Sequence, residues 1–265
     1  MLDASLSRLI HRRAHIKGPL VLMYHSVADA GPLRPEWPWA VSRQRFREQL
    51  DFLRDAGWLT CTQAELATGG PSHGERTVAI TFDDGYADNH GACDDLLRRD
   101  MKASWFVVSG SVGQPPRWQD PDQPRLRILD AGQLRDMHAA GMEIGSHTVS
   151  HARLPTLDDA ALARELTDSR AALEDLLGAP VTGLAYPYGL YDERCRTAAR
   201  DAGYRHASTT QSGWALLDKD PFLVRRLTVY NADTAATLAR KLAYAANDVA
   251  WSHLLGERAA RFLHR

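Results

Sequence analysis

TVAITFDDG, residues 77–85, is an uncharged apolar run that ends abruptly in two acids and a glycine. β-Branched and aromatic residues without polar alternation are typical of a strand buried on both faces, as in a parallel sheet. Gly85 favours a turn directly after the strand. Functional sites of α/β proteins lie at the carboxyl ends of such strands. This stretch therefore indicates both a fold class and the place where chemistry is expected.

Six further runs of this kind occur along the chain, and helix-patterned stretches separate them. They span residues 20–25, 103–108, 142–147, 181–186, 205–210 and 222–229. Strands that alternate with helices predict an α/β protein with a parallel sheet. Seven such units without a break in composition predict one barrel rather than two domains. An open doubly wound sheet is the alternative, although its dinucleotide and P-loop glycine fingerprints are absent.

The predicted helices carry recognisable start and stop signals. They span residues 42–56, 62–69, 89–99, 130–140, 156–177, 192–202 and 234–246. Thr62 with Glu65 has the pattern of a capping box, and so has Asp130 with Gln133. Glycines follow several of these helices, where they suit the C-terminal cap. The proline-rich stretch 111–129 is a predicted loop long enough to border a cleft.

The composition is that of an ordinary soluble globular protein, with 265 residues, 44% of them hydrophobic and 25% charged. A net charge of −1 gives no argument for a nucleic-acid partner. Cys61, Cys93 and Cys195 are too few for a disulfide framework, and their odd number fits a reducing compartment. No segment has the ~20 apolar residues of a membrane span, and we find no secretory signal peptide. We therefore expect a cytoplasmic protein.

Two adjacent acids and a pair of histidines follow two of the predicted strands. Asp83 and Asp84 follow the run at 77–82, where neighbouring side chains point in opposite directions, so each acid can have its own task. His147 ends another run, and His151 follows four residues later, a spacing that places both side chains on one helical face. Two imidazoles and one carboxylate suit a catalytic Zn²⁺ or another first-row divalent ion. The alternatives are a simple turn at the acids and surface or capping histidines.

Three motifs occur in a characteristic order: TFDDG at 81–85, SHTVSH at 146–151 and AYPYG at 185–189. They resemble the first three motifs of the polysaccharide deacetylase family, the NodB-homology group or carbohydrate esterase family 4. The resemblance covers about residues 20–230. It implies a distorted (β/α)7 TIM-like barrel in a single domain. It also implies metal-dependent hydrolysis of acetamides on N-acetylated sugars, or of acetyl esters.

The resemblance further implies roles for individual residues. Asp83 matches the catalytic base of the family, and Asp84, His147 and His151 match its metal ligands. Tyr188 matches the tyrosine whose backbone N–H helps to hold the oxyanion. Zn²⁺ is the expected ion, with Co²⁺ or Ni²⁺ as alternatives.

The chain departs from the family pattern in two places. Most members have an arginine where Ala185 stands, and they have a late Leu-x-His motif that residues 222–229 lack. The opening LVLMYHSV resembles the circularly permuted subgroup that includes poly-N-acetylglucosamine deacetylases, and this makes His25 the expected general acid. Arg226 is expected to supply the missing cation, since its neighbour Arg225 faces the opposite way. The alternatives are a buried structural His25 and an exterior ion pair at Arg226.

Four tryptophans in predicted loops are candidate sugar contacts, with core packing as the alternative. They are Trp37, Trp39, Trp118 and Trp214. Three regions are expected: a basic N-terminal extension at 1–19, the deacetylase barrel at 20–232 and a C-terminal helical region at 233–265. The two ends mix basic and apolar residues. Packing on the barrel or self-association is the favoured interpretation of these ends, and peripheral contact with an anionic membrane is the alternative.

The sequence therefore predicts a metal-dependent hydrolase that removes N-acetyl groups from an N-acetylhexosamine-containing polysaccharide, oligosaccharide or glycoconjugate. Its expected partner is an acetylated carbohydrate, and no nucleic acid is expected. A carbohydrate O-acetyl esterase and a catalytically silent carbohydrate-binding homologue are the alternatives. The oligomeric state stays open.

Overall fold

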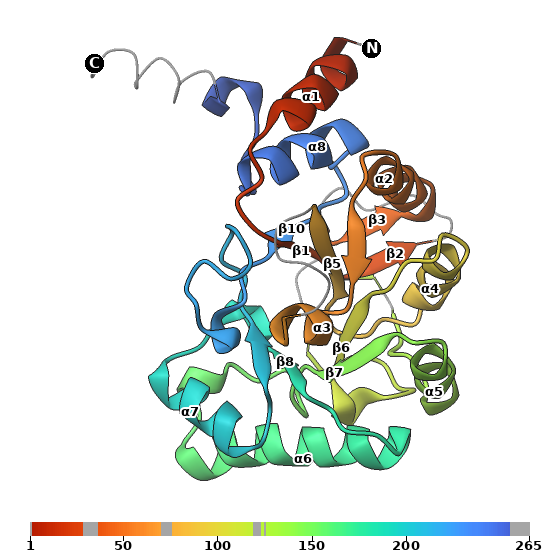
Figure 1. The fold of residues 1–265 in the computed structure, drawn as a ribbon. Helices are drawn as coiled ribbons and strands as arrows, with labels where there is room; N and C mark the ends of the chain where they lie inside the picture. The colour runs from red at the N-terminus through yellow and green to blue at the C-terminus, as the bar shows by residue number, and fades with distance from the viewer. Residues whose placement is uncertain (1, 29–36, 70–75, 119–122, 125, 255–265) are drawn as a thin grey trace.

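The computed structural model describes residues 2–28, 37–69, 76–118, 123–124 and 126–254 of the chain. A curled parallel sheet lies at its centre, with helices around it (Figure 1). In spatial order the strands are β10 (Leu227–Thr228), β1 (Leu20–Tyr24), β5 (Thr77–Phe82), β6 (Ser104–Val107), β7 (Glu143–Ser146), β8 (Gly183–Ala185) and β9 (His206–Ser208). This arrangement confirms the predicted single-domain α/β fold with a distorted seven-stranded barrel.

The barrel closes through residues 222–229, and the prediction of one continuous strand there is wrong. Val224 forms a parallel bridge with Ser208 of β9, whereas β10 pairs with β1. The segment opens with a 3-10 turn at Pro221–Leu223. Between its two pairing sites, the amide of Arg226 donates to the carbonyl of Gln211 in a loop. The strand is therefore divided, and Arg226 lies at the seam between the first and last parts of the sheet.

Three short strands were not predicted. They are β2 (Ser26–Ala28), β3 (Ala40–Ser42) and β4 (Leu59–Cys61). β2 and β3 form a small parallel sheet of their own, and β4 pairs with β5. Each is three residues long, too short for a periodicity to be read from sequence.

The helices follow the predicted order. They are α1 (Leu2–Arg13), α2 (Arg43–Asp55), α3 (Gln63–Ala67), α4 (Asn89–Leu97), α5 (Ala131–Ala139), α6 (Asp159–Leu177), α7 (Glu193–Asp201) and α8 (Ala235–Tyr244). The capping boxes at Thr62 and Asp130 are confirmed. The predicted start of α6 at residue 156 is wrong. Thr156 ends a separate 3-10 turn, and the side chain of Asp158 caps the helix by accepting from the amide of Ala161 at 2.7 Å.

Side-chain alternation along β5 directs Asp83 into the barrel. Ile80 and Phe82 belong to the main hydrophobic core, whereas Ala79 belongs to a separate small cluster. Successive side chains of a strand point to opposite faces, so Thr81 and Asp83 share the inner face with Ala79. The strand is completely buried, which explains its apolar sequence.

A buried polar cluster lies at the opposite end of the barrel, where β6, β7 and β9 begin. Glu143 accepts from the Ser104 hydroxyl at 2.6 Å and from the Ala64 amide at 2.9 Å. Gln63 Nε2 lies 3.0 Å from Nδ1 of His206. Helix α3 is therefore fixed across this end of the barrel. His206 is a structural residue here.

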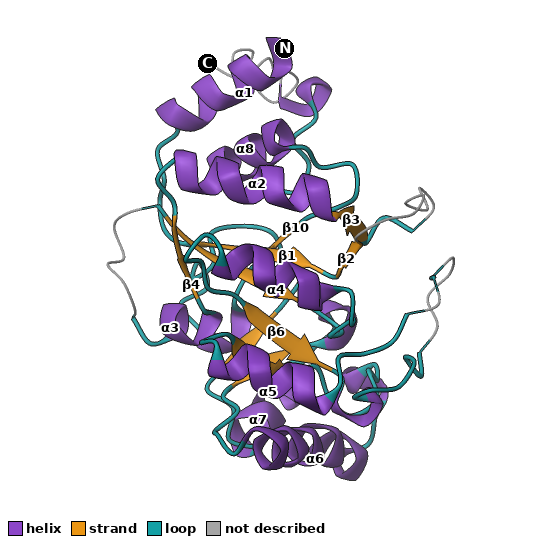
Figure 2. Cartoon of the chain, turned by 90° about the vertical axis from the view of Figure 1, so that its right-hand side faces the viewer, coloured by secondary structure: helices purple, strands orange, loops and turns teal. Residues whose placement is uncertain are grey.

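Helices α1 and α8 pack together beyond the strand pair β10–β1 (Figures 1 and 2). The buried guanidinium of Arg240 in α8 donates to Asp3 at 2.7 Å and to Ser7 at 2.6 Å, both in α1. His11 of α1 is also buried and accepts a hydrogen bond from Trp58 at 3.0 Å. The boundaries of the three expected regions stay a prediction. None of the described helices is both long and apolar enough to cross a bilayer.

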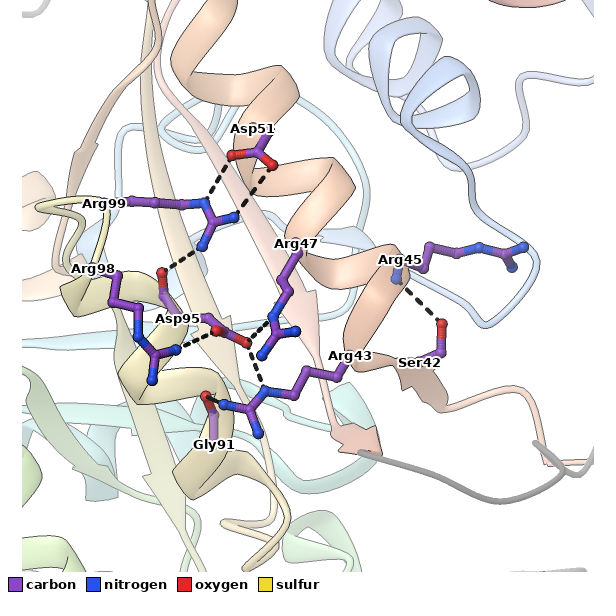
Figure 3. Close-up of polar contacts among 9 residues, drawn as sticks. All are labelled: Ser42, Arg43, Arg45, Arg47, Asp51, Gly91, Asp95, Arg98 and Arg99. Carbon is purple, nitrogen blue, oxygen red and sulfur yellow. Dashed lines mark hydrogen bonds and ion pairs between the residues drawn. The ribbon is translucent and has the colours of Figure 1, made fainter.

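One buried carboxylate joins α2 to α4 (Figure 3). The side chain of Asp95 in α4 is 1% exposed and accepts from Arg43 at 2.7 Å and from Arg47 at 2.9 Å. Arg98 adds a third contact at 2.8 Å. Burial alone would raise the pKa of Asp95, but the guanidinium groups of Arg43 and Arg47 lower it. The charges therefore hold two neighbouring helices of the outer layer together.

Candidate active site

A buried ion pair lies at the carboxyl end of the barrel. Asp83 directly follows β5 and Arg226 directly precedes β10, and their side chains are 4% and 0% exposed. The two Nη atoms of Arg226 donate to the two carboxylate oxygens at 2.6 and 2.7 Å, while its Nε donates to the Thr209 carbonyl at 2.9 Å. This parallel geometry fixes the orientation of the carboxylate. Arg225 instead pairs with Asp218 outside the pocket.

The electrostatics of Asp83 follow from this pairing. Burial alone would raise the pKa of the carboxyl group. The charge of Arg226, the nearby His147 and the hydrogen bonds from Arg226 outweigh burial and lower this pKa to about 2. Asp83 is therefore ionised at neutral pH and able to accept a proton.

Three buried side chains from the ends of β5 and β7 form a group with metal-ligand chemistry. Oδ1 of Asp84 lies 3.5 Å from Nε2 of His147 and 3.4 Å from Nε2 of His151. Nδ1 of His147 lies 2.8 Å from the carbonyl oxygen of Ala185. A carbonyl only accepts, so this nitrogen carries the proton and Nε2 directs its lone pair toward Asp84.

These donor atoms fit a metal ion better than they fit a hydrogen bond. Burial lowers the pKa of His147, and it lowers that of His151 to about 2, so both rings are neutral. A charge-assisted hydrogen bond would be about 2.7–2.9 Å long. A lone pair that faces a carboxylate oxygen is repulsive unless a cation lies between them. Ligands about 2.0–2.1 Å from a tetrahedral Zn²⁺ are separated by about 3.4 Å, which matches the spacing of these atoms.

The predicted helical face for His147 and His151 is wrong. Residues 147–153 form a turn, and His151 has a φ of 61°. Glu165 of α6 holds this turn, because its carboxylate accepts from the amides of Val149 and Ser150, both at 2.9 Å, and from the Ser150 hydroxyl at 2.6 Å. The two imidazoles therefore converge through a turn braced by α6 and not through helical spacing.

Backbone strain is concentrated at this site. Among the described residues, seven non-glycine residues have a positive φ, and four of them lie here: Asp84, Thr148, His151 and Tyr188, with φ between 59° and 70°. Each such conformation costs on the order of 1 kcal/mol. The left-handed turn at Asp84 brings both acids to the same pocket. They still have different partners, since Asp83 binds Arg226 and Asp84 faces the two histidines.

Aromatic rings hold His151 from two sides. The rings of Tyr188 and Trp118 have centroids 4.4 and 4.6 Å from that of His151. The guanidinium of Arg153 lies 4.2 Å from the Tyr188 ring centroid. Nδ1 of His151 is buried and has no hydrogen-bond partner among the described residues, so ring packing sets the orientation of this imidazole. Trp118 belongs to the predicted loop 111–129, so this loop contacts His151.

His25 lies between β1 and β2 on the same pocket wall as Asp83. Its ring centroid is 4.5 Å from that of Trp39, which in turn lies 5.3 Å from the ring of Tyr230. Nδ1 of His25 is buried without a hydrogen-bond partner among the described residues, which argues against a purely structural histidine satisfied by backbone. Burial lowers the pKa of His25 to about 4, although the charge of Asp83 opposes the shift. Its imidazole is therefore neutral in the resting site.

One pocket of about 540 Å³ brings these groups together. Its wall includes His25, Asp83, Asp84, His147, His151 and Tyr188, together with Trp37, Trp39, Thr210, Tyr230 and Asn247. Arg226 is not part of this wall and supports Asp83 by its ion pair. Of the four candidate tryptophans, Trp37 and Trp39 border the pocket, Trp118 packs on His151, and Trp214 packs on the core outside this wall.

Several residues at this site were not found from the sequence. Tyr230 and Asn247 line the pocket, and Glu165 braces the turn that carries His151. Tyr230 directly follows the predicted strand 222–229, so the strand-end rule applied there would have found it. Asn247 follows α8 and Glu165 belongs to α6. No local pattern distinguishes them from other polar residues in or near helices.

Comparisons with known proteins agree with this geometry. Residues 70–207, just over half of the chain, match the family model described as Polysaccharide deacetylase. YxkH of Bacillus subtilis (strain 168), which is named for this family, is 30% identical over 213 residues, covering 79% of this chain and 70% of that protein. A poly-beta-1,6-N-acetyl-D-glucosamine N-deacetylase of Staphylococcus epidermidis is 25% identical over 244 residues, covering 84% and 82%.

A solved structure extends the likeness to the whole fold. The Streptococcus pyogenes deacetylase PplD, in complex with acetate, superimposes with a TM-score of 0.74 at 23% identity, covering 86% of this chain and 99% of that one. The residues that match the family model, 70–207, include five of the predicted site residues: Asp83, Asp84, His147, His151 and Tyr188. With its barrel fold and its three motifs in order, the chain belongs to the polysaccharide deacetylase family.

Proposed function

We propose that this protein removes N-acetyl groups from an N-acetylhexosamine-containing polysaccharide, oligosaccharide or glycoconjugate by metal-dependent hydrolysis. One observation carries the proposal: the ionised Asp83 and the buried group of Asp84, His147 and His151 face the same pocket. A relative named as an N-deacetylase of poly-beta-1,6-N-acetyl-D-glucosamine supports an acetylated carbohydrate as the substrate.

Asp84, His147 and His151 would hold the divalent ion, with Zn²⁺ expected and Co²⁺ or Ni²⁺ as alternatives. Two nitrogen donors and one carboxylate suit these first-row ions. When bound, such an ion supplies Lewis acidity, which polarises the acetyl carbonyl and lowers the pKa of water.

Asp83 is the general base of the proposed reaction. It takes a proton from water as the water attacks the acetyl carbonyl. Arg226 binds both carboxylate oxygens and so limits their motion. The same positive charge makes Asp83 a weak base, since its pKa is about 2. Attack therefore depends on the acidification of water at the site.

The other two roles belong to Tyr188 and His25. The backbone N–H of Tyr188 donates to the developing oxyanion, and one such donor contributes about 3–4 kcal/mol of transition-state stabilisation. His25 gives a proton to the leaving amine. Because its resting pKa is about 4, His25 must first gain that proton. Transfer from protonated Asp83, the stronger acid with a pKa of about 2, is downhill and restores the ionised Asp83. His25 then returns to its neutral form when it gives this proton to the amine.

Arg226 also bears on the alternative of a silent carbohydrate-binding homologue. The reason for that alternative was the family arginine missing at Ala185. The bidentate contact from Arg226 gives Asp83 an equivalent cation and so supports an active enzyme. An O-acetyl esterase would use the same residues but would need the acid less, because an alkoxide leaves more readily than an amide nitrogen.

Acetate release from matched N-acetylated and O-acetylated oligosaccharides, together with metal analysis, tests the proposal. We expect release from N-acetylated sugars and close to one bound ion per chain. Asp83→Asn should abolish nearly all turnover and leave the bound metal in place. Asp94→Asn, at an exposed acid of α4, is the control that should keep both.

Three outcomes would contradict this assignment. Bound metal without acetate release from any acetylated sugar would favour the binding protein, and release from esters alone would favour the esterase. Normal turnover in Asp83→Asn would refute the base. A cytoplasmic location stays a prediction.

A further inference from the structure

The outward side of α1 is an exposed apolar surface. Leu2, Leu6 and Leu9 are 90%, 47% and 43% exposed, and their spacing places them along one side of the helix. Tyr244 at the end of α8 is 38% exposed. These four residues line a groove together with Trp251, and we call them the α1 face.

Basic side chains border the α1 face. Arg8, Arg12, Arg13 and Lys17 are exposed, and none of them forms an ion pair within the part of the chain that the structure describes. The only acid of α1, Asp3, is compensated by Arg240 at 2.7 Å. The face therefore combines exposed leucines with cations that no neighbouring carboxylate neutralises.

We propose that the α1 face binds the surface of an anionic lipid bilayer. A helix with leucines on its outer side and arginines beside them can insert the apolar side chains at the acyl boundary while the arginines contact lipid headgroups. Each such cation adds about fivefold to the partition coefficient. The sequence alone favoured packing of this region on the barrel. In the structure α1 does pack on α8, with Ser7 bound to Arg240, and its buried His11 contacts Phe52 and Trp58. Its leucines stay exposed.

Charge distinguishes the bilayer from two other occupants of the α1 face. A second copy in a two-fold interface would place Arg8, Arg12 and Arg13 opposite the same arginines, which is unfavourable. Residues 255–265 of this chain carry three arginines and one glutamate, so they are also basic. An anionic lipid surface is the complementary partner.

The test is flotation of the full-length protein with vesicles. Phosphatidylcholine vesicles with about 30 mol% phosphatidylglycerol should carry the protein upward, and vesicles of phosphatidylcholine alone should not. Raising the salt concentration to about 0.5 M should weaken binding, because headgroup contacts are screened.

Two variants separate the apolar and the basic contribution. Leu6→Gln/Leu9→Gln should lower vesicle binding at least about tenfold. Arg8→Gln/Arg12→Gln/Arg13→Gln should lower it on the order of 100-fold. Leu59→Gln/Leu97→Gln is the matched control, because these leucines are equally exposed, at 45% and 44%, and lie on β4 and α4. The control should bind as the unchanged protein does.

Circular dichroism and the melting temperature would show that each variant is folded. Absence of flotation with the unchanged protein would overturn the proposal. Equal binding to neutral vesicles, or equal losses in the matched control, would also overturn it. A concentration-dependent dimer in sedimentation, abolished by Leu6→Gln/Leu9→Gln and accompanied by no vesicle binding, would assign the α1 face to a second copy.

Discussion

Arg226 binds Asp83 through two parallel hydrogen bonds of 2.6 and 2.7 Å, although 143 residues separate them in the chain. The family pattern has its arginine at the position of Ala185, on β8. Here the cation comes from Arg226, directly before β10. Ala185 keeps a different contact, since its carbonyl oxygen lies 2.8 Å from Nδ1 of His147.

Replacing Arg226 should change the pH dependence of turnover. Arg226→Met removes the charge that lowers the pKa of Asp83, so this pKa should rise from about 2 to above its ordinary value. The ionised base then forms only at higher pH, and the acid limb of the kcat/KM profile should move upward. Loss of the bidentate contact should reduce kcat by about 10²-fold. Acetate release between about pH 4 and 9 measures both effects.

Two further variants show whether the effect of Arg226→Met is specific. Arg226→Lys keeps a positive charge but not the parallel hydrogen bonds, so kcat should fall with little movement of the acid limb. Arg225→Met removes a neighbouring arginine that pairs with Asp218 outside the pocket, and it should leave the profile unchanged. Arg226→Met should also lose about 3–5 kcal/mol of stability, because a buried charge is left uncompensated. An unshifted acid limb in a folded Arg226→Met protein would refute the pairing as the cause of the low pKa.

The sequence predicted the barrel because its central strands are buried on both faces. β5 and β1 are buried at every position and carry no charged residue, and that pattern is local enough to be recognised. The closure of the barrel is not local. Residues 222–229 pair with two different strands, with β9 at Val224 and with β1 at Leu227. No periodicity within eight residues reveals a strand that changes its pairing partner.

The candidate site was predictable to the extent that strand ends determine it. His25, Asp83 and His147 end or follow strands, so topology alone brings them to one edge. The position of His151 depends instead on a left-handed turn and on Glu165 from another helix. Those contacts are tertiary, so they cannot be read from the local sequence. The spacing of four residues predicted a helix, whereas His147 and His151 converge through a turn.

Glu165 should matter for metal affinity although it does not contact the pocket. Its carboxylate holds the amides of Val149 and Ser150, and these fix the turn that carries His151. Outer contacts of this kind are typically worth about 10–100-fold in metal affinity. Glu165→Ala should therefore weaken Zn²⁺ binding by that factor, as measured by competition with a chromogenic chelator.

A second glutamate of α6 provides the control for Glu165→Ala. Glu174 accepts from the amide of Val181, away from the metal-ligand group, so Glu174→Ala should lower stability slightly and leave metal affinity unchanged. Equal weakening in both variants would mean that the helix as a whole, and not the brace at Glu165, sets the affinity.

His25 should matter more for amides than for esters. An amine must be protonated as it leaves, whereas an alkoxide leaves more easily. His25→Gln should lower the rate on an N-acetylated sugar by about 10²–10⁴-fold and the rate on a matched O-acetylated sugar by much less. The ester substrate serves as the internal control for folding and metal content. Equal losses on both substrates would remove His25 as the acid.

His11 should make folding depend on pH outside the active site. Burial, with a smaller effect from Arg76, lowers its pKa from 6.5 to about 4, so the folded state favours the neutral ring. The resulting stabilisation is fully present above pH 6.5 and is lost as the pH falls toward 4, with a total of about 3 kcal/mol. Urea unfolding of wild type and His11→Gln at several pH values measures this difference, since Gln keeps an acceptor for Trp58 without titrating.

His15→Gln, at an exposed histidine, is the control that should follow wild type. Parallel stability curves for wild type and His11→Gln would show that protonation of His11 does not control the docking of α1.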